Sequence, residues 1–168
     1  LDRKEKMDEL DQADRDFLAP YMDKLLAMRV DIAAKMFEYR KENILFEGAQ
    51  GAMLDLDSGT YPYVSSGASC SAGASSGAGI GPRALDKILG VFKAYETRVG
   101  NGPMPTEFND STESELCDYV RKTGNEFGVT TGRPRRCGYL DLVALRYACH
   151  VNSIDSIVLA HLAIYDEL

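Results

Sequence analysis

The sequence predicts an α/β fold, and three observations support this prediction. Short apolar segments typical of strands alternate along the chain with segments whose apolar residues recur at the period of a helix. The first such strand ends in a glycine-rich turn, as in open α/β sheets that present groups to a ligand. The length of 168 residues, with 45 % hydrophobic residues, suits one ordinary domain or part of a larger one.

Residues 1–42 are predicted to form a peripheral helical segment. Apolar side chains recur there along one face, which Pro20 interrupts or bends. The face comprises Leu18, Met22, Leu25, Leu26, Val30, Ile32, Ala33, Met36 and Phe37. We expect a helical hairpin on the outside of a domain, with no chemistry of its own.

The alternating strands and helices are predicted downstream of residue 42. Strands are expected at 43–46, 96–99 and 154–162, the last of them buried, and helices at 83–95, 111–122 and 138–150. Between them, residues 65–81 have almost no bulky side chains, since five are Gly, six Ser and four Ala. This segment is either a close-fitting cradle for a ligand, built from backbone N–H groups and hydroxyls, or a flexible linker.

Composition excludes several classes of protein. With 26 acidic and 19 basic residues the net charge is −7, so a general electrostatic attraction to nucleic acid is not expected. No apolar run approaches the roughly 20 residues of a membrane helix, and no export leader is visible. The four cysteines form no CxxC pair, which argues against a zinc site and a secreted disulfide scaffold. A reduced, cytoplasmic protein is the simplest expectation.

Residues 130–136 carry the densest chemical signal, because Arg133, Arg135 and Arg136 gather there beside two threonines. Guanidinium groups match the geometry of carboxylates and phosphates, so a small dianionic ligand is one interpretation. A solvated basic loop and a nucleic-acid contact are the alternatives. No GxxxxGK[ST] phosphate loop is present, Pro82 breaks a dinucleotide-type glycine pattern at 77–82, and no catalytic base is evident.

Several motifs, in the same order, resemble the adenylosuccinate synthetase family. They are FEGAQG at 46–51, GTYPYV at 59–64, KAY at 93–95, TRVG at 97–100, GP at 102–103, PTE at 105–107, GNEFG at 124–128 and TTGR at 130–133. The resemblance covers about residues 40–155. It implies a mostly parallel central sheet flanked by helices, with residues 43–168 forming the central portion of a ligase domain.

The resemblance also implies a reaction. A nucleoside triphosphate, with Mg²⁺, phosphorylates the 6-oxygen of a purine nucleoside monophosphate, and L-aspartate then displaces that phosphate. Family members form homodimers. The family's amino-terminal phosphate loop, with its catalytic Asp and His, and its carboxyl-terminal part are absent from this chain, as are Mg²⁺ ligands. The chain alone is therefore expected to be inactive.

Site residues follow from the matching motifs. Gln50 matches a catalytic glutamine near the purine 6-oxygen, where an amide stabilises developing charge, and Ser65 stands at a nucleotide-phosphate threonine. The loop that closes on aspartate corresponds to Val129, Thr130, Thr131, Gly132, Arg133, Pro134 and Arg135. Within it, Arg133 also lies near the nucleotide ribose, and Arg135 faces the triphosphate donor.

Two departures bear on specificity. The family's Ser-Ser-Asn-Thr-Thr reads Ser-Gly-Ala-Ser-Cys at 66–70, and its guanine-reading Thr-Lys-Leu-Asp reads Ala-His-Leu-Ala at 160–163. A carboxylate accepts hydrogen bonds from guanine, and Ala163 does not, so ATP is expected as donor. His161 either stacks on a base or is an ordinary core or surface histidine.

Three functions remain open on these residues. The departures favour the bacteriophage 2-aminoadenylosuccinate synthetase branch, in which dGMP is the substrate. The alternative is an orthodox enzyme that uses IMP and GTP. A non-catalytic nucleotide-binding module is a third possibility. Neither a nucleic-acid nor a membrane partner is expected.

Overall fold

The computed structural model describes residues 10–109, 111–128 and 132–166. The chain divides into two compact units, Leu1–Asn43 and Ile44–Leu168.

The first unit is helical. It contains α1 (Gln12–Leu18), the 3₁₀ turn η2 (Ala19–Tyr21) that holds Pro20, α2 (Met22–Ala27) and α3 (Ile32–Glu38). Asp11 caps α1 by accepting from the backbone N–H of Asp14 at 2.9 Å, and Asp31 caps α3 in the same way through Ala34 at 3.0 Å. None of the residues in these helices is buried, so the predicted apolar face of residues 1–42 covers no core within this unit.

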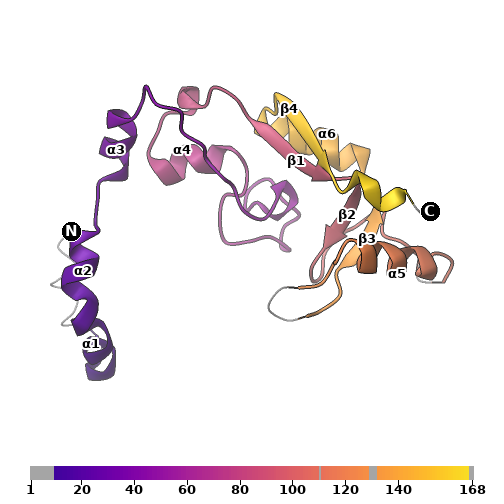
Figure 1. The fold of residues 1–168 in the computed structure, drawn as a ribbon, viewed down its shortest axis with the longest axis horizontal. Coiled ribbons are helices and arrows are strands. Elements are labelled where there is room, and N and C mark those ends of the chain that lie inside the picture. Colours follow the sequence, from indigo (N-terminus) through magenta and orange to yellow (C-terminus); the bar gives the residue numbers. More distant parts are fainter. Residues whose placement is uncertain (1–9, 110, 129–131, 167–168) are drawn as a thin grey trace. The chain divides into compact units, whose positions relative to one another are not determined.

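The second unit carries the α/β fold (Figure 1). Strand β1 (Leu89–Lys93) pairs in parallel with β4 (Ser156–Ala160), and β2 (Tyr95–Arg98) pairs antiparallel with β3 (Arg136–Tyr139). The helices are α4 (Ala72–Ala78), α5 (Ser114–Thr123) and α6 (Leu142–Asn152), with short 3₁₀ turns η3 (Ala52–Leu54), η4 (Pro82–Ala84) and η5 (Leu162–Tyr165). A parallel strand pair flanked by helices confirms the predicted α/β class.

Three predicted elements differ from the structure. The helix expected over 83–95 is wrong, because residues 89–93 hydrogen-bond to β4 and tertiary pairing outweighs the apolar spacing. Residues 43–46 form no strand, and they pair with none of the strands among the described residues, so the strand predicted there is wrong. The strand at 154–162 exists as β4, but Val158 and its neighbours are half exposed rather than buried.

Three other elements are confirmed with shifted ends. The strand at 96–99 is β2, the helix at 111–122 is α5 and the helix at 138–150 is α6. Helix α6 begins later than predicted because Asp141 caps it, accepting from Val143 and Ala144, while the preceding residues complete β3.

The small-residue segment 65–81 is anchored rather than a flexible linker. It contains α4, and the residue before that helix is tied to the end of α6. The Ser71 N–H donates to Asn152 Oδ1 at 2.7 Å, and the Ser71 hydroxyl donates to the Asn152 carbonyl at 3.0 Å. The linker interpretation is therefore wrong, and the cradle interpretation stays a prediction.

A small core joins the β2–β3 pair to α5. Its buried members are Tyr95, Phe108, Cys117, Val120, Cys137 and Ile164. Phe108 meets the ring of Tyr139 edge-on, with centroids 4.8 Å apart. Because Tyr95 begins β2, this core fixes the point at which the chain leaves the parallel pair and enters the antiparallel one.

A buried carboxylate holds the loop between residues 55 and 70. Asp55 is 3 % exposed. Its Oδ1 accepts from the backbone N–H groups of Asp57 and Ser58, at 3.0 and 2.9 Å, and its Oδ2 accepts from that of Cys70 at 2.9 Å. The bonds from Cys70 and Ser58 lower the pKa of Asp55 to about 2.

Replacing Asp55 by alanine is expected to lower the free energy of unfolding by about 1–3 kcal/mol, because three backbone N–H groups lose a charged acceptor. The folded-state pKa lies below the ordinary 3.8, so the stabilisation is present above that pH and is lost as the pH falls toward 2. Chemical unfolding at several pH values measures both effects. Asp57→Ala, a change at an exposed neighbour that keeps its backbone N–H, is the control. An equal loss in both variants would contradict the assignment.

Candidate functional site

The carboxyl ends of the parallel strands meet at one edge of the second unit. Strand β1 ends at Lys93 and β4 ends at Ala160, and the Ala94 N–H donates to the Ala160 carbonyl at 2.9 Å. Just beyond, the rings of Tyr95 and His161 meet edge to face with centroids 5.9 Å apart. Ligands of open α/β sheets bind outside this edge. The residues around Tyr95 and His161 are therefore candidate site residues.

Glu126 is the buried charge at this edge, with 1 % of its surface exposed. Its Oε1 accepts from Lys93 Nζ at 2.7 Å and from the Tyr95 hydroxyl at 2.5 Å. Its Oε2 accepts from Arg135 Nη1 at 2.8 Å. We call these four side chains the Glu126 cluster.

The cluster keeps Glu126 ionised. Burial raises the pKa of Glu126, but hydrogen bonds from Lys93, Tyr95 and Arg135 outweigh burial and lower it. Burial, together with the bond to Glu126, raises the pKa of Tyr95. One anion thus faces two cations and a neutral phenol.

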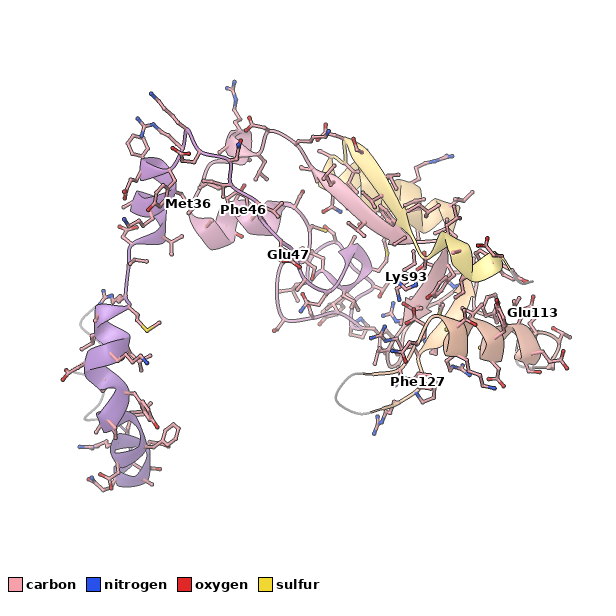
Figure 2. All side chains as sticks on the ribbon, viewed as in Figure 1. Met36, Phe46, Glu47, Lys93, Glu113 and Phe127 are labelled. Atoms are coloured by element: carbon pink, nitrogen blue, oxygen red, sulfur yellow. The ribbon has the colours of Figure 1, made fainter. Side chains whose placement is uncertain are left out.

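A hairpin presents the predicted anion-binding loop from this cluster. Phe127 pairs with Pro134 at its base, and the Arg135 N–H donates to the Glu126 carbonyl at 2.9 Å. Beyond the base, the Gly128 N–H donates to the Arg133 carbonyl at 2.8 Å. Figure 2 shows Lys93 on the sheet and Phe127 at the hairpin. The predicted residues Val129, Thr130 and Thr131 lie outside the described residues.

The arginines of the hairpin differ in their surroundings. Arg133 is exposed, whereas Arg135 is partly buried and paired with Glu126. The Arg135 carbonyl also accepts from Arg121 Nε, in α5, at 3.1 Å. Gly132, between the loop and Arg133, has a positive φ of 63°, which suits a residue without a Cβ. Arg135 is therefore anchored and Arg133 faces solvent.

Gln50 and Ser65 belong to a second group, which Ser69 joins. The Ser69 hydroxyl lies 3.5 Å from Gln50 Oε1 and 3.4 Å from the Ser65 hydroxyl. The Ser65 hydroxyl also donates to the Leu54 carbonyl at 2.9 Å. Gln50 is exposed, with a φ of 62°, a left-handed backbone conformation that costs a non-glycine residue energy and occurs often at functional positions.

Arg98 connects the loop before Ser65 to strand β2. Its Nη2 donates to the Thr60 hydroxyl at 2.9 Å and to the Tyr63 carbonyl at 3.0 Å. Arg98, at one end of β2, thus holds the loop before Ser65, and Tyr95, at the other end, belongs to the Glu126 cluster. That Gln50 and Arg133 meet at one site stays a prediction.

Sequence reasoning missed the Glu126 cluster and the role of Asp55. Lys93, Tyr95 and Glu126 lie within the motifs KAY and GNEFG, which carry the family resemblance. The only local signal for a buried charge was Glu126 itself, an acidic residue with a glycine two positions away on each side, just after a predicted helix. Its partners are 33 and 31 residues away, so no local spacing reveals the cluster.

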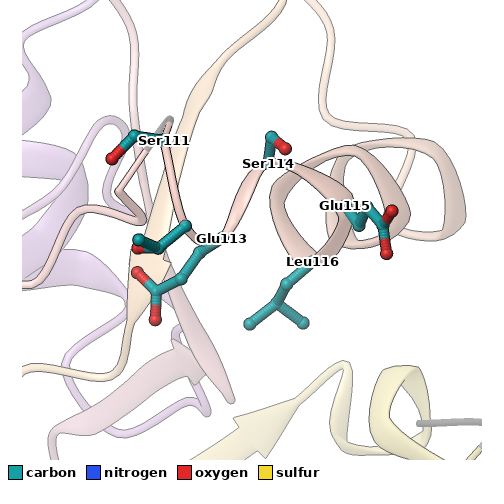
Figure 3. Close-up of a pocket in the computed structure, with 6 residues that line it drawn as sticks. Ser111, Glu113, Ser114, Glu115 and Leu116 are labelled. Carbon is teal, nitrogen blue, oxygen red and sulfur yellow. The ribbon is translucent and has the colours of Figure 1, made fainter.

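Other features of the described residues carry no site. They contain no group of three carboxylate, histidine or cysteine side chains able to hold a metal ion. A hollow of about 590 Å³ opens at the start of α5, lined by Ser111, Thr112, Glu113, Ser114, Glu115 and Leu116 (Figure 3). None of the predicted site residues lines it, and Glu113 already accepts from the Tyr139 hydroxyl at 2.6 Å.

The four cysteines are free, and no described helix is long and apolar enough to cross a membrane.

Comparison with known proteins establishes the family. The sequence profile of adenylosuccinate synthetase matches residues 3–168. The chain belongs to the adenylosuccinate synthetase family. It is 52 % identical over 148 residues to the adenylosuccinate synthetase of Hahella chejuensis, a match that covers 87 % of this chain and 33 % of that protein. It is 50 % identical over 159 residues to that of Heliobacterium modesticaldum, covering 94 % and 36 %.

Solved structures agree on the fold of the adenylosuccinate synthetase family. The fully ligated enzyme from Plasmodium falciparum superposes with a TM-score of 0.82 at 43 % identity, covering 89 % of this chain and 35 % of that one. A succinoaminodeoxyadenylate synthetase of cyanophage S-2L, bound to dGMP and dATP, gives 0.53 at 23 % identity, covering 67 % and 34 %. The latter shows the fold alone. The chain spans about a third of the length of the curated relatives it matches.

The positive φ of Gln50 predicts different responses to two substitutions. Gln50→Gly is expected to change the free energy of unfolding by no more than about 0.5 kcal/mol, because glycine adopts this conformation without strain. Gln50→Val is expected to lower it by about 1–2 kcal/mol, because a β-branched side chain is strained there. Denaturant unfolding of both variants measures the difference. A valine variant as stable as the wild type would contradict the backbone assignment.

Proposed function

We propose that the protein containing this chain joins L-aspartate to IMP, with GTP as the phosphoryl donor, in the cytoplasm. The identity of about 50 % to curated adenylosuccinate synthetases carries this proposal. The sequence departures favour the dGMP-using phage branch, but the cyanophage enzyme bound to dGMP is 23 % identical to this chain and supports the fold alone. The orthodox reaction is therefore the better supported of the two.

In this proposal the Gln50 group binds the nucleotide. The Gln50 amide lies beside the purine 6-oxygen and stabilises the charge that develops there, as preorganised dipoles do. Ser65 binds the nucleotide phosphate. An exposed polar side chain held at a positive φ, with Ser69 against it, supports a role beyond folding.

The hairpin holds the two other substrates. Thr131 and Arg133 bind the carboxylates of aspartate within the loop Val129, Thr130, Thr131, Gly132, Arg133, Pro134 and Arg135. Arg133 also approaches the ribose, and Arg135 faces the triphosphate. The solvent exposure of Arg133 supports contact with an incoming substrate, and the hydrogen bonds of Arg135 support a fixed position facing the donor.

Two displacements make the product. The purine 6-oxygen attacks the γ-phosphorus of the triphosphate, the bond from that phosphorus to the diphosphate leaving group breaks, and the purine N1 loses its proton. The aspartate amine then attacks C6, the C6–O bond breaks, inorganic phosphate leaves and the amine loses a proton. The phosphoryl group makes the oxygen a good leaving group. Mg²⁺ is expected from the family. The described residues contain no group of side chains that could hold a metal ion, so neither displacement is assigned to one.

We expect the protein to form a homodimer.

The test is aspartate-dependent phosphate release by the protein containing this chain. It is assayed with IMP or dGMP as acceptor and with GTP or ATP as donor. Turnover with IMP supports the proposal, and turnover with dGMP alone overturns it in favour of the phage-type reaction. Nucleotide binding without turnover on any pair would instead indicate a binding module.

Arg133→Leu is expected to abolish aspartate use, because the incoming dianion loses a bidentate partner. Initial rates against aspartate concentration measure the effect, with at least a hundredfold fall in kcat/KM for aspartate expected from lost charged hydrogen bonds. Arg146→Leu, at an exposed position of α6, is the matched control. Unchanged saturation by aspartate in the Arg133 variant would remove it from the site.

Ala163 bears on the choice between GTP and ATP, because it lacks the carboxylate that favours GTP. It is exposed in η5, two residues after His161, where the family has an aspartate that accepts from guanine. Ala163→Asp is expected to raise the GTP-to-ATP ratio of kcat/KM by about ten- to a hundredfold, the worth of hydrogen bonds to a charged group. Ala163→Asn, similar in size but uncharged, is the control. An unchanged ratio in the aspartate variant would show that the donor base lies elsewhere.

A further inference from the structure

We propose that Glu126 is a positioning residue that fixes the guanidinium of Arg135 toward the donor triphosphate. The inference rests on the proposed function, since it takes Arg135 as a donor-binding residue. Glu126 itself, with 1 % of its surface exposed, touches no substrate in this scheme. It acts through the 2.8 Å bond from Arg135 Nη1 to its Oε2.

The carboxylate is oriented before Arg135 reaches it. Lys93, from the end of β1, and Tyr95, from the start of β2, both donate to Oε1. They leave Oε2 for the arginine. Two strand-borne donors on one oxygen set the plane of the carboxylate, so the opposite oxygen offers Arg135 a fixed acceptor.

The main chain of Arg135 is held as firmly as its side chain. Its N–H donates to the Glu126 carbonyl at 2.9 Å, and its carbonyl accepts from Arg121 Nε at 3.1 Å. The Arg135 Nε is buried and has no hydrogen-bond partner among residues 10–109, 111–128 and 132–166. A buried donor without an acceptor is costly and calls for an explanation, which a bound anion would supply.

The same cluster reaches the segment expected to read the donor base. The Tyr95 ring, whose hydroxyl binds Glu126, meets the ring of His161 at 85° and 5.9 Å. His161 is the second residue of the segment 160–163, which stands in place of the guanine-reading motif. In this proposal the Glu126 cluster supports both ends of the donor: the base side through the ring contact of Tyr95 with His161, and the triphosphate side through Arg135.

A double-mutant cycle on the protein containing this chain tests the inference. Glu126→Gln, Arg135→Gln and the pair are compared by the KM of the donor triphosphate and by the Kd of GDP. Each single variant is expected to raise the donor KM and the Kd of GDP about tenfold, which corresponds to the loss of one charge-assisted hydrogen bond. In the Arg135→Gln background, Glu126→Gln is expected to add less than about twofold. The KM of aspartate is expected to stay within about twofold in Glu126→Gln.

Matched variants separate positioning from general stability. Glu107→Gln removes the ion pair to Arg136, the neighbour of Arg135, without touching the Glu126 cluster, and should leave the donor KM unchanged. Should Glu126→Gln fail to fold by thermal unfolding, Tyr95→Phe and Lys93→Gln, which each remove one donor to Oε1, replace it in the cycle. The inference would be overturned if the effects of Glu126→Gln and Arg135→Gln on the donor KM and the Kd of GDP multiplied in the double variant. It would also be overturned if Glu126→Gln had no effect on either constant.

The two proposals fail differently. A wild-type protein that binds GDP but turns over no substrate would refute the proposed reaction, while the Kd cycle would still decide the role of Glu126. A wild-type protein that is active, with independent effects at positions 126 and 135, would refute only the positioning role.

Discussion

The arrangement of the second unit depends on one buried carboxylate. Burying an ionised group is costly unless opposite charges and hydrogen bonds compensate it, and removing a single partner leaves a charge uncompensated. Glu126 meets that requirement with Lys93, Tyr95 and Arg135. Because these partners come from β1, β2 and the hairpin, satisfying one side chain fixes three segments that are distant in sequence.

A second carboxylate organises the part of the chain that cannot form a core. Residues 65–81 lack bulky side chains, so apolar burial contributes little to their order. Asp55 accepts from the backbone N–H of Cys70 within this segment and from that of Asp57 before it, and Asn152 holds the residue before α4. Hydrogen bonding to buried side chains thus takes over where hydrophobic packing is weak, and it places Ser65 and Ser69 beside Gln50.

The predictability of the fold follows from how local each signal is. The α/β class and the presence of β2, α5 and α6 follow from local patterns, whereas the start of α6 is set by the cap at Asp141. Residues 83–95 were assigned to a helix because Leu85, Ile88, Leu89 and Phe92 suit a helical face, yet partners 67 residues away draw 89–93 into a strand. The site divides in the same way. Gln50 and the arginines stand out in short motifs, whereas the role of Glu126 depends on contacts that only the folded chain creates.

The Glu126 cluster and the turn after β4 differ in what a substitution would cost. Each charge of the Glu126 cluster has a partner within the cluster, so removing one side chain leaves a buried charge without full compensation. Ala163 and His161 lie on an exposed turn after β4, outside that cluster, and His161 touches it only through a ring edge. A substitution there leaves no buried charge unpaired. Under the proposed function, the end of the donor site that meets the base can therefore change at little cost in stability, whereas replacing Arg135 leaves the buried Glu126 short of a partner.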